Sequence, residues 1–188
     1  MKIILASQSP FRRHALDVLG VSYETIPSNF DESSVRDKDP KELARKLSES
    51  KALTIGEAHI DDIVIASDLL VVSNGIILEK PKDEQNAFEM LSRLSGSCFE
   101  IITGLAVYNA KNKKMLSAVE TCSVTFRRLE DHEIRDYIAR YPAVKCAGAF
   151  EDNGLLRFAE SISGSYNFRA AMPVNKLVYF LREQGIKV

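Results

Sequence analysis

Two adjacent arginines, Arg12 and Arg13, are the first residues of this chain whose type and spacing suit chemistry. An apolar strand precedes them, and Ser9 and Pro10 suit the N-cap and the first turn of a helix. A helix start presents free backbone N–H groups and a partial positive charge, and arginine supplies donors that match phosphate oxygens. Residues 3–13 therefore predict an anion-binding elbow, although an ordinary strand-to-helix connection with solvated arginines would use the same residue types.

A lysine falls where the next expected helix should be apolar. Asp39-Pro40-Lys41-Glu42 has the pattern of a capping box and predicts a helix that runs to about residue 57. At roughly 100° per residue, Lys51 lies in the middle of the apolar stripe of that helix. The stripe consists of Leu43, Ala44, Leu47 and Ile55. Because burial of an unpaired ammonium is costly, Lys51 either extends to a sheet edge or reaches a phosphate or a carboxylate.

A carboxylate follows the apolar run at residues 63–67. In α/β proteins the ends of strands commonly carry the groups that contact ligands, so Asp68 is a candidate site residue. The alternative is an aspartate that only forms the turn after a strand.

Strand-like and helix-like segments alternate along the chain, which predicts an α/β architecture to position these side chains. Expected strands cover residues 2–6, 21–26, 62–66, 69–72, 76–78, 98–108 and 115–127. Expected helices cover residues 10–19, 40–57, 83–94 and 130–140, and a last one begins at Pro173 and ends before Gly185. Asn74-Gly75 has the chemistry of a type I′ hairpin turn. No Pro/Gly/Ser linker divides the chain, so one domain over residues 1–188 is expected.

Composition narrows the classes of function. The 188 residues are 45% hydrophobic and 27% charged, which is typical of a globular protein. A net charge of −1 gives no basis for a nucleic-acid partner, and no run approaches the roughly 18 apolar residues of a membrane span. Cys98, Cys122 and Cys146 lack CxxC pairing, which argues against a disulfide framework and a zinc site. Without a signal-peptide pattern, we expect a cytoplasmic protein.

The segment IILASQSPFRRHAL resembles the N-terminal pattern LAS-x-SP-x-RR-x-x-L of the Maf family of nucleotide pyrophosphatases. Further similarities follow in the family's order, up to about residue 181. They are the acidic pair Asp31-Glu32, the ESKA segment with Lys51, the ASD segment with Asp68, the EKP segment with Lys80, and Thr103-Gly104-Leu105. Residues 126–129 (FRRL) and 146–150 (CAGAF) resemble the YceF-type subgroup, which is associated with hydrolysis of 7-methyl-GTP.

This resemblance implies an α/β fold of the Maf and inosine-triphosphatase kind, a mixed twisted sheet flanked by helices with a substrate cleft between two lobes. It implies hydrolysis of a nucleoside triphosphate between the α- and β-phosphates, with Asp68 as the catalytic base. The implied phosphate ligands are Ser7, Ser9, Arg12, Arg13, Lys51 and Lys80. A divalent cation, Mg²⁺ or Mn²⁺, would be held by Glu32 and Asp68. Family precedent is also compatible with a homodimer.

Departures from the subgroup pattern fall at positions assigned to substrate selection. Phe11, Leu69 and Asn153 stand where YceF-type proteins usually have Trp, Gln and Glu. Phe11 can still stack on a base, whereas Leu69 and Asn153 remove a polar group and a charge. The tail SGSYNFRAAMPV also differs from the usual GxPxxxxGLP. Two alternatives therefore stay open: an enzyme of the dTTP/UTP type, and a nucleotide-binding regulator of cell division with little catalysis.

Overall fold

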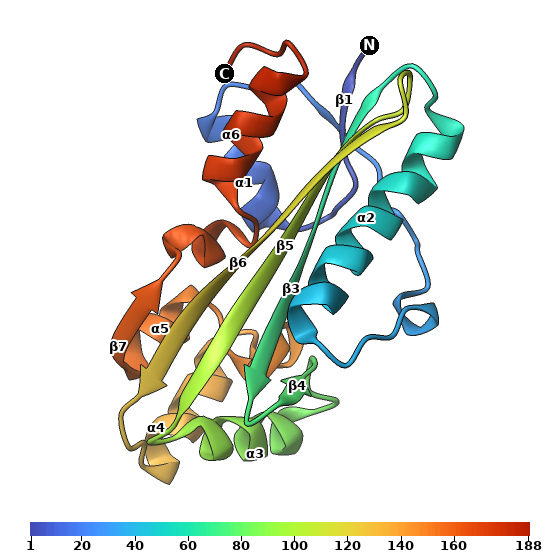
Figure 1. Ribbon diagram of the computed structural model, residues 1–188. Helices are drawn as coiled ribbons and strands as arrows, with labels where there is room; N and C mark the ends of the chain where they lie inside the picture. The colour runs from blue at the N-terminus through green and yellow to red at the C-terminus, as the bar shows by residue number, and fades with distance from the viewer. The chain divides into compact units, whose positions relative to one another are not determined.

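A mixed β-sheet runs through the chain, with helices packed against it (Figure 1). The structure is a computed structural model that describes all residues 1–188. The strand order is β2-β1-β3-β5-β6-β7, and β4 pairs with β3. Strand β1 is parallel to both neighbours, whereas the β3–β4 and β6–β7 pairs are antiparallel. The expected mixed α/β sheet is therefore confirmed.

The strands are β1 (Ile3–Leu5), β2 (Glu24–Thr25), β3 (Ile63–Ser73), β4 (Ile76–Leu78), β5 (Cys98–Asn109), β6 (Lys114–Phe126) and β7 (Ala159–Gly164). The α-helices are α1 (Pro10–Val18), α2 (Pro40–Ala58), α3 (Glu84–Leu94), α4 (Asp131–Arg140), α5 (Asp152–Phe158) and α6 (Val174–Glu183). Short 3₁₀ helices are η1 (Glu32–Ser34), η2 (Ala143–Lys145), η3 (Ala147–Ala149) and η4 (Tyr166–Ala170). No helix combines the length and the apolar character needed to cross a membrane.

The chain forms two compact units, each built from separate stretches of sequence. The first consists of Met1–Leu69, Thr103–Glu120 and Tyr166–Val188, and the second of Leu70–Ile102 and Thr121–Ser165. Strands β3, β5 and β6 contribute residues to both units. The expected single domain over the whole chain stays a prediction.

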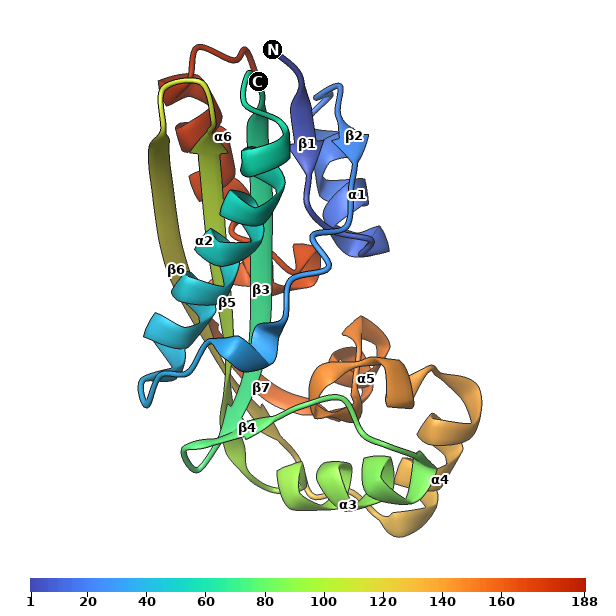
Figure 2. The same ribbon diagram turned by 90° about the vertical axis from the view of Figure 1, so that its right-hand side faces the viewer.

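In the first unit, two hydrophobic clusters cover the two faces of the sheet. Successive side chains of a strand point to opposite faces, so Ile3 and Leu5 pack with α1 and α6, whereas Ile4 packs with α2. Figure 2 shows α2 and α1 on different sides of β3. The same alternation in β3 places Ile63 and Ile65 in the first cluster and Val64 and Ala66 in the second. This unit therefore has a helix–sheet–helix arrangement.

In the second unit, an aromatic cluster forms the core. Its members are Phe99, Phe126, Tyr137, Phe150 and Phe158, with ring centroids 4.8–5.6 Å apart in the successive pairs. The expected hairpin turn is present before β4, since Asn74 and Gly75 have φ values of 50° and 74°. Helices α3 and α4 also belong to this unit.

Several expected elements differ from the structure. Strand β3 is continuous over Ile63–Ser73, because the apolar residues after Asp68 are buried and extend the strand. The expected strand at residues 21–26 is reduced to Glu24–Thr25. Asp39 accepts a hydrogen bond from Lys41 N at 2.9 Å, but Glu42 pairs with Arg45 instead of completing a capping box. Helix α5 and strand β7 had no signal strong enough to be predicted.

Gly104 lets helix α2 lie directly against strand β5. A Cβ atom at this position would lie 2.3 Å from the Ala44 carbonyl oxygen and 2.6 Å from Ser48 Oγ. Both atoms belong to the buried face of α2, and the first is backbone, so the helix itself would have to move. The close approach brings the face of α2 that carries Lys51 down onto the sheet.

We predict that Gly104→Ala lowers the free energy of unfolding by about 1–3 kcal/mol, because α2 must shift away from β5. Urea denaturation of the purified protein measures this loss. Gly56→Ala is a matched control in the same contact region. Its Cβ would meet the Tyr108 ring at 2.6 Å, and a side chain can rotate where a helix backbone cannot. A loss at Gly56 as large as that at Gly104 would contradict this explanation.

Candidate functional site

A buried ion-pair network in the first unit joins three of the expected site residues. Lys51 Nζ lies 2.5 Å from Asp68 Oδ1 and 2.8 Å from Glu32 Oε1. The side chains of Lys51 and Asp68 are only 10% and 9% exposed, whereas that of Glu32 is 59% exposed. The lysine in the apolar stripe of α2 thus reaches carboxylates, one of the two destinations expected for it.

Each member of this network is positioned by a different element. Helix α2 buries Lys51 on the same face as Ala44, Leu47 and Ile55. Asp68 lies in the middle of β3, so the expectation that it ends a strand is wrong. A carboxylate is tolerated there because the ammonium of Lys51 compensates its burial. Glu32 opens η1, which Asp31 caps by accepting a hydrogen bond from Ser33 N at 2.9 Å.

Arg12 is anchored at two points in the same unit. Its Nε donates to the carbonyl oxygen of Ala171 at 3.0 Å, and its Nη1 donates to Ser7 Oγ at 3.1 Å. These bonds use two of the five N–H donors of a guanidinium, so donors for an anion remain. Burial lowers the pKa of Arg12, and the charges of Asp68 and Glu32 oppose this shift.

Ser7 and Ser9 form the turn that leads into α1. Ser7 is buried, and its Oγ accepts a hydrogen bond from Ser9 N at 3.1 Å. Ser9 is the N-cap residue of α1 and Pro10 follows it, as expected, but the Ser9 side chain makes no capping hydrogen bond. The side chains near this helix start are therefore ordered mainly by Ser7, which bonds both the turn and Arg12.

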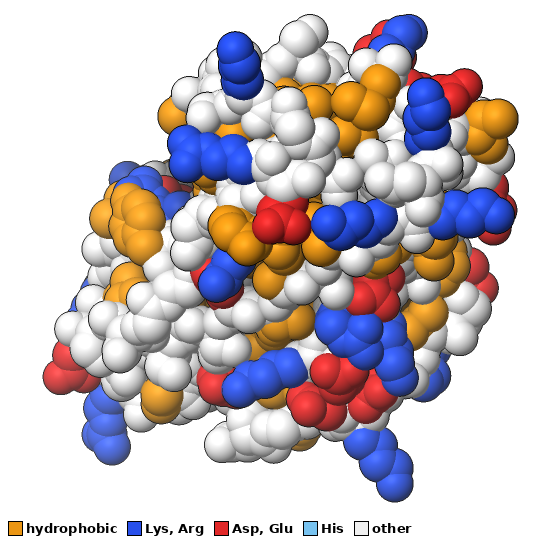
Figure 3. All heavy atoms as spheres, turned by 45° about the horizontal axis from the view of Figure 1, so that its top comes forward, with side chains coloured by type: hydrophobic (Ala, Val, Ile, Leu, Met, Phe, Trp, Pro, Cys, Tyr) orange, Lys and Arg blue, Asp and Glu red, His pale blue; other side chains and the backbone are white.

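The remaining expected residues of the first unit are less enclosed. Arg13 is exposed, Phe11 is 40% exposed and Leu69 is half-buried. Lysines and arginines are interspersed with acidic side chains on the face in Figure 3, without a continuous basic surface.

Lys80 and Asn153 belong to the second unit. Lys80 is exposed, and the preceding carbonyl of Glu79 accepts a hydrogen bond from Gly148 N at 3.3 Å. Burial raises the pKa of the Cys146 thiol, Glu151 raises it further, and Lys80 lowers it. Asn153 is exposed on α5, where its Nδ2 donates to Glu151 Oε1 at 2.7 Å. A shared site of these residues with Asp68 stays a prediction.

Two residues near Arg12 and Asp68 were not singled out from the sequence. Ser67 is fully buried, with its Oγ 2.5 Å from the Gly104 carbonyl oxygen and 3.0 Å from that of Ala171. A polar residue inside an apolar run was the available signal for Ser67. Ala171 acts through its backbone oxygen, so its side-chain type gave no signal.

The Maf-like protein family model matches residues 2–184 of the chain. The chain belongs to the Maf family. A dTTP/UTP pyrophosphatase of Clostridium perfringens is 36% identical over 191 residues, which cover 100% of both proteins. A 7-methyl-GTP pyrophosphatase of Vibrio vulnificus is 34% identical over 189 residues, which cover 100% of this chain and 97% of that protein.

The fold also resembles that of a solved structure, the Ham1 protein of Staphylococcus aureus. The TM-score is 0.51 at 15% sequence identity, over 98% of this chain and 100% of the other. This likeness supports the mixed sheet flanked by helices. As a Maf nucleotide pyrophosphatase, the chain is a hydrolase that acts on acid anhydrides.

Maf proteins generally use a divalent metal ion, and the donors near Lys51 fit a weakly ligated one. No cluster of three or more His, Cys, Asp or Glu side chains is arranged to hold a metal ion by itself. Glu32 and Asp68, however, both direct carboxylate oxygens at one cation, the Lys51 ammonium. Mg²⁺ is typically bound by one or two carboxylates together with substrate phosphates and water, which matches this donor set.

We predict that Lys51→Met lowers the free energy of unfolding by about 3–5 kcal/mol, because Asp68 would remain buried without its counter-ion. Urea denaturation measures the loss, and Lys51→Met/Asp68→Asn should recover part of it. Lys46→Met is the matched control on the same helix. Its partner is Asp37 and its side chain is 42% exposed, so it should cost about 1 kcal/mol or less. Equal losses at the two lysines would contradict a buried network.

Proposed function

We propose that this Maf protein hydrolyses a nucleoside triphosphate between the α- and β-phosphates, giving a nucleoside monophosphate and pyrophosphate. The observation that carries the proposal is the pairing of a buried carboxylate, Asp68, with Lys51, in the same unit as the anchored guanidinium of Arg12. A water-activating carboxylate and a cationic phosphate ligand are the groups this reaction needs.

In this mechanism Asp68 orients a water molecule and accepts its proton. The water oxygen forms a bond to the α-phosphorus, the anhydride bond to the β-phosphate breaks, and pyrophosphate leaves. Arg12 binds the phosphate oxygens on which charge accumulates in the transition state. By resemblance to the family, the further proposed phosphate ligands are Ser7, Ser9, Arg13, Lys51 and Lys80.

Lys51 holds the Asp68 carboxylate in place before substrate binds. The ion pair at 2.5 Å fixes the position of the carboxylate oxygen Oδ1 beside the ammonium. Glu32 and Asp68 would hold the divalent ion, Mg²⁺ or Mn²⁺, which when bound would neutralise phosphate charge. Glu32 suits this part because its exposed side chain on a short 3₁₀ turn can exchange one cation for another.

The first candidate substrate is 7-methyl-GTP. The CAGAF segment at residues 146–150 favours it, and so does the Vibrio vulnificus relative. In this assignment Phe11, with its partly exposed ring, stacks on the base, and the positive charge of a methylated guanine strengthens the contact. Leu69 and Asn153 stand where YceF-type proteins usually have Gln and Glu, so this assignment gives them no charge of their own for the base.

The second candidate is dTTP or UTP. Relatives from Clostridium perfringens and Clostridium tetani, at 36% and 35% identity, carry the name dTTP/UTP pyrophosphatase. An apolar Leu69 and an uncharged Asn153 are compatible with a smaller, uncharged pyrimidine. The base of 7-methyl-GTP is positively charged, whereas the bases of dTTP and UTP are uncharged.

We predict that the purified protein with Mg²⁺ or Mn²⁺ releases pyrophosphate and a monophosphate from one of these triphosphates. The panel contains 7-methyl-GTP, GTP, dTTP, UTP, dCTP and ATP, and products are separated by anion-exchange chromatography. A higher kcat/KM for 7-methyl-GTP than for GTP supports the first candidate, and a preference for dTTP and UTP supports the second. Orthophosphate and a nucleoside diphosphate as first products would contradict cleavage at the α–β bond.

We predict that Asp68→Asn lowers kcat by about 10²–10⁴-fold, the usual contribution of a general base, while KM changes little. Steady-state kinetics with the best substrate of the panel measures this. Asp61→Asn, at an exposed aspartate before β3, is the control for removal of a negative charge. Full activity of Asp68→Asn in a folded protein would remove Asp68 from the mechanism.

A further inference from the structure

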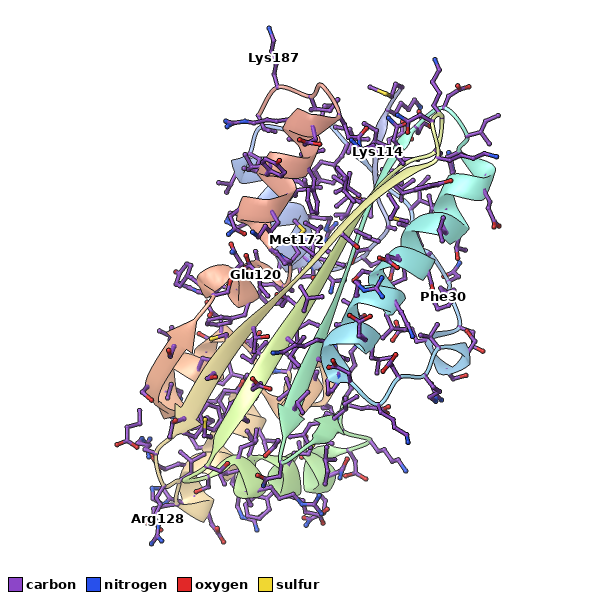
Figure 4. The ribbon with its side chains drawn as sticks, in the orientation of Figure 1. Phe30, Lys114, Glu120, Arg128, Met172 and Lys187 are labelled. Carbon is purple, nitrogen blue, oxygen red and sulfur yellow. The ribbon has the colours of Figure 1, made fainter.

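Ala171 has an unusual backbone conformation close to the anchored arginine. Its φ of 52° lies in the left-handed region, where a Cβ atom is unfavourable and glycine or asparagine is the common choice. It follows η4, and its N–H donates to the Phe168 carbonyl oxygen at 2.9 Å. The next residue, Met172, is fully buried in the same cluster as Leu177 and Leu181 of α6 (Figure 4).

The carbonyl oxygen of Ala171 joins two elements of the candidate site. It accepts a hydrogen bond from Arg12 Nε at 3.0 Å, and Ser67 Oγ lies 3.0 Å from it and 2.5 Å from the Gly104 carbonyl oxygen. The Ser67 hydroxyl has one proton to share between these two carbonyl oxygens, whereas the Nε–H of Arg12 is directed at the Ala171 oxygen. Arg12 lies on α1, and Ser67 immediately precedes Asp68 on β3. One backbone atom therefore connects the arginine to the strand that carries the carboxylate.

The left-handed conformation determines where this carbonyl points. A change of residue 171 to a right-handed or extended conformation would rotate its peptide plane and withdraw the acceptor from Arg12. A donor that loses its acceptor inside a protein is costly, so the guanidinium would turn to another partner. Strained backbone that persists beside a functional group is commonly held there by the surrounding structure.

We propose that Ala171 is a positioning residue for phosphate binding: its left-handed carbonyl holds Arg12 in the orientation that meets the anion. The proposal rests on the phosphate-binding part of the proposed function. It assigns a role to the backbone of a residue outside the α1 motif, 159 positions along the chain from Arg12.

Three substitutions at residue 171 separate backbone conformation from side-chain loss. Ala171→Gly and Ala171→Asn accept the left-handed conformation, whereas the branched side chain of Ala171→Val opposes it. In ¹⁵N NMR spectra, the Arg12 Nε–H signal should be protected from solvent exchange in the wild type, Ala171→Gly and Ala171→Asn. It should lose protection in Ala171→Val. Calorimetry should show about tenfold weaker binding of inorganic pyrophosphate by Ala171→Val, and changes within about twofold for the other two.

Lys113 provides a matched control for backbone strain. It has a φ of 57° in the turn between β5 and β6, outside the elements that carry Arg12 and Ala171. Lys113→Val should lower Tm by a few degrees, as should Ala171→Val, without affecting the Arg12 signal or pyrophosphate binding. In an Arg12→Ala background, Ala171→Val should not weaken pyrophosphate binding further.

Wild-type pyrophosphate affinity in Ala171→Val, or an equal loss with and without Arg12, would overturn the positioning role. Failure of the wild type to bind pyrophosphate would overturn the inference as well, because Arg12 would then have no anion to meet. Failure to hydrolyse any triphosphate, with pyrophosphate binding intact, would overturn the proposed reaction alone.

Discussion

The ammonium of Lys51 between Asp68 and Glu32 is the interaction on which the candidate site depends. Asp68 lies inside a buried strand, where an isolated carboxylate would be neutralised by protonation or would disrupt the strand. Lys51 is equally out of place in the apolar stripe of α2. Each charge makes the burial of the other acceptable, and the pair exists only where α2 and β3 lie within reach of each other.

Close packing of backbone atoms determines how near α2 lies to the sheet. Gly104 on β5 leaves room for the backbone of α2, so the helix lies closer to the sheet than a strand with a side chain at that position would permit. Glu32 adds the second carboxylate from an exposed turn, where it has access to solvent that Asp68 lacks. The network thus has a buried part, Lys51 with Asp68, and an exposed part, Glu32. Such a division suits a site that must receive a highly charged ligand and its cation.

The sequence alone predicted those features of the site that depend on neighbouring residues in the chain. The 3.6-residue period of α2 exposed Lys51 as an anomaly, and Ser9-Pro10 marked the start of α1 correctly. Local patterns could not show that β3 continues through Asp68, because an aspartate after an apolar run usually marks a turn. The reason for its burial is a lysine 17 residues away, which only the tertiary structure brings near.

Arg12 is a second residue whose setting depends on tertiary contacts that the sequence does not show. Its type and position predicted an anion ligand, but its orientation is set by Ser7 and by a backbone oxygen near the C-terminal helix. No pattern of residue types encodes a carbonyl group, since every residue has one. The residues proposed for substrate selection are also not contiguous in the fold. Phe11 and Leu69 lie in the first unit, and Asn153 lies in the second. The proposed phosphate ligands Ser7, Ser9, Arg12, Arg13 and Lys51 lie in the first unit, whereas Lys80 lies in the second. Family members can share the phosphate chemistry and still differ in the nucleotide that they hydrolyse.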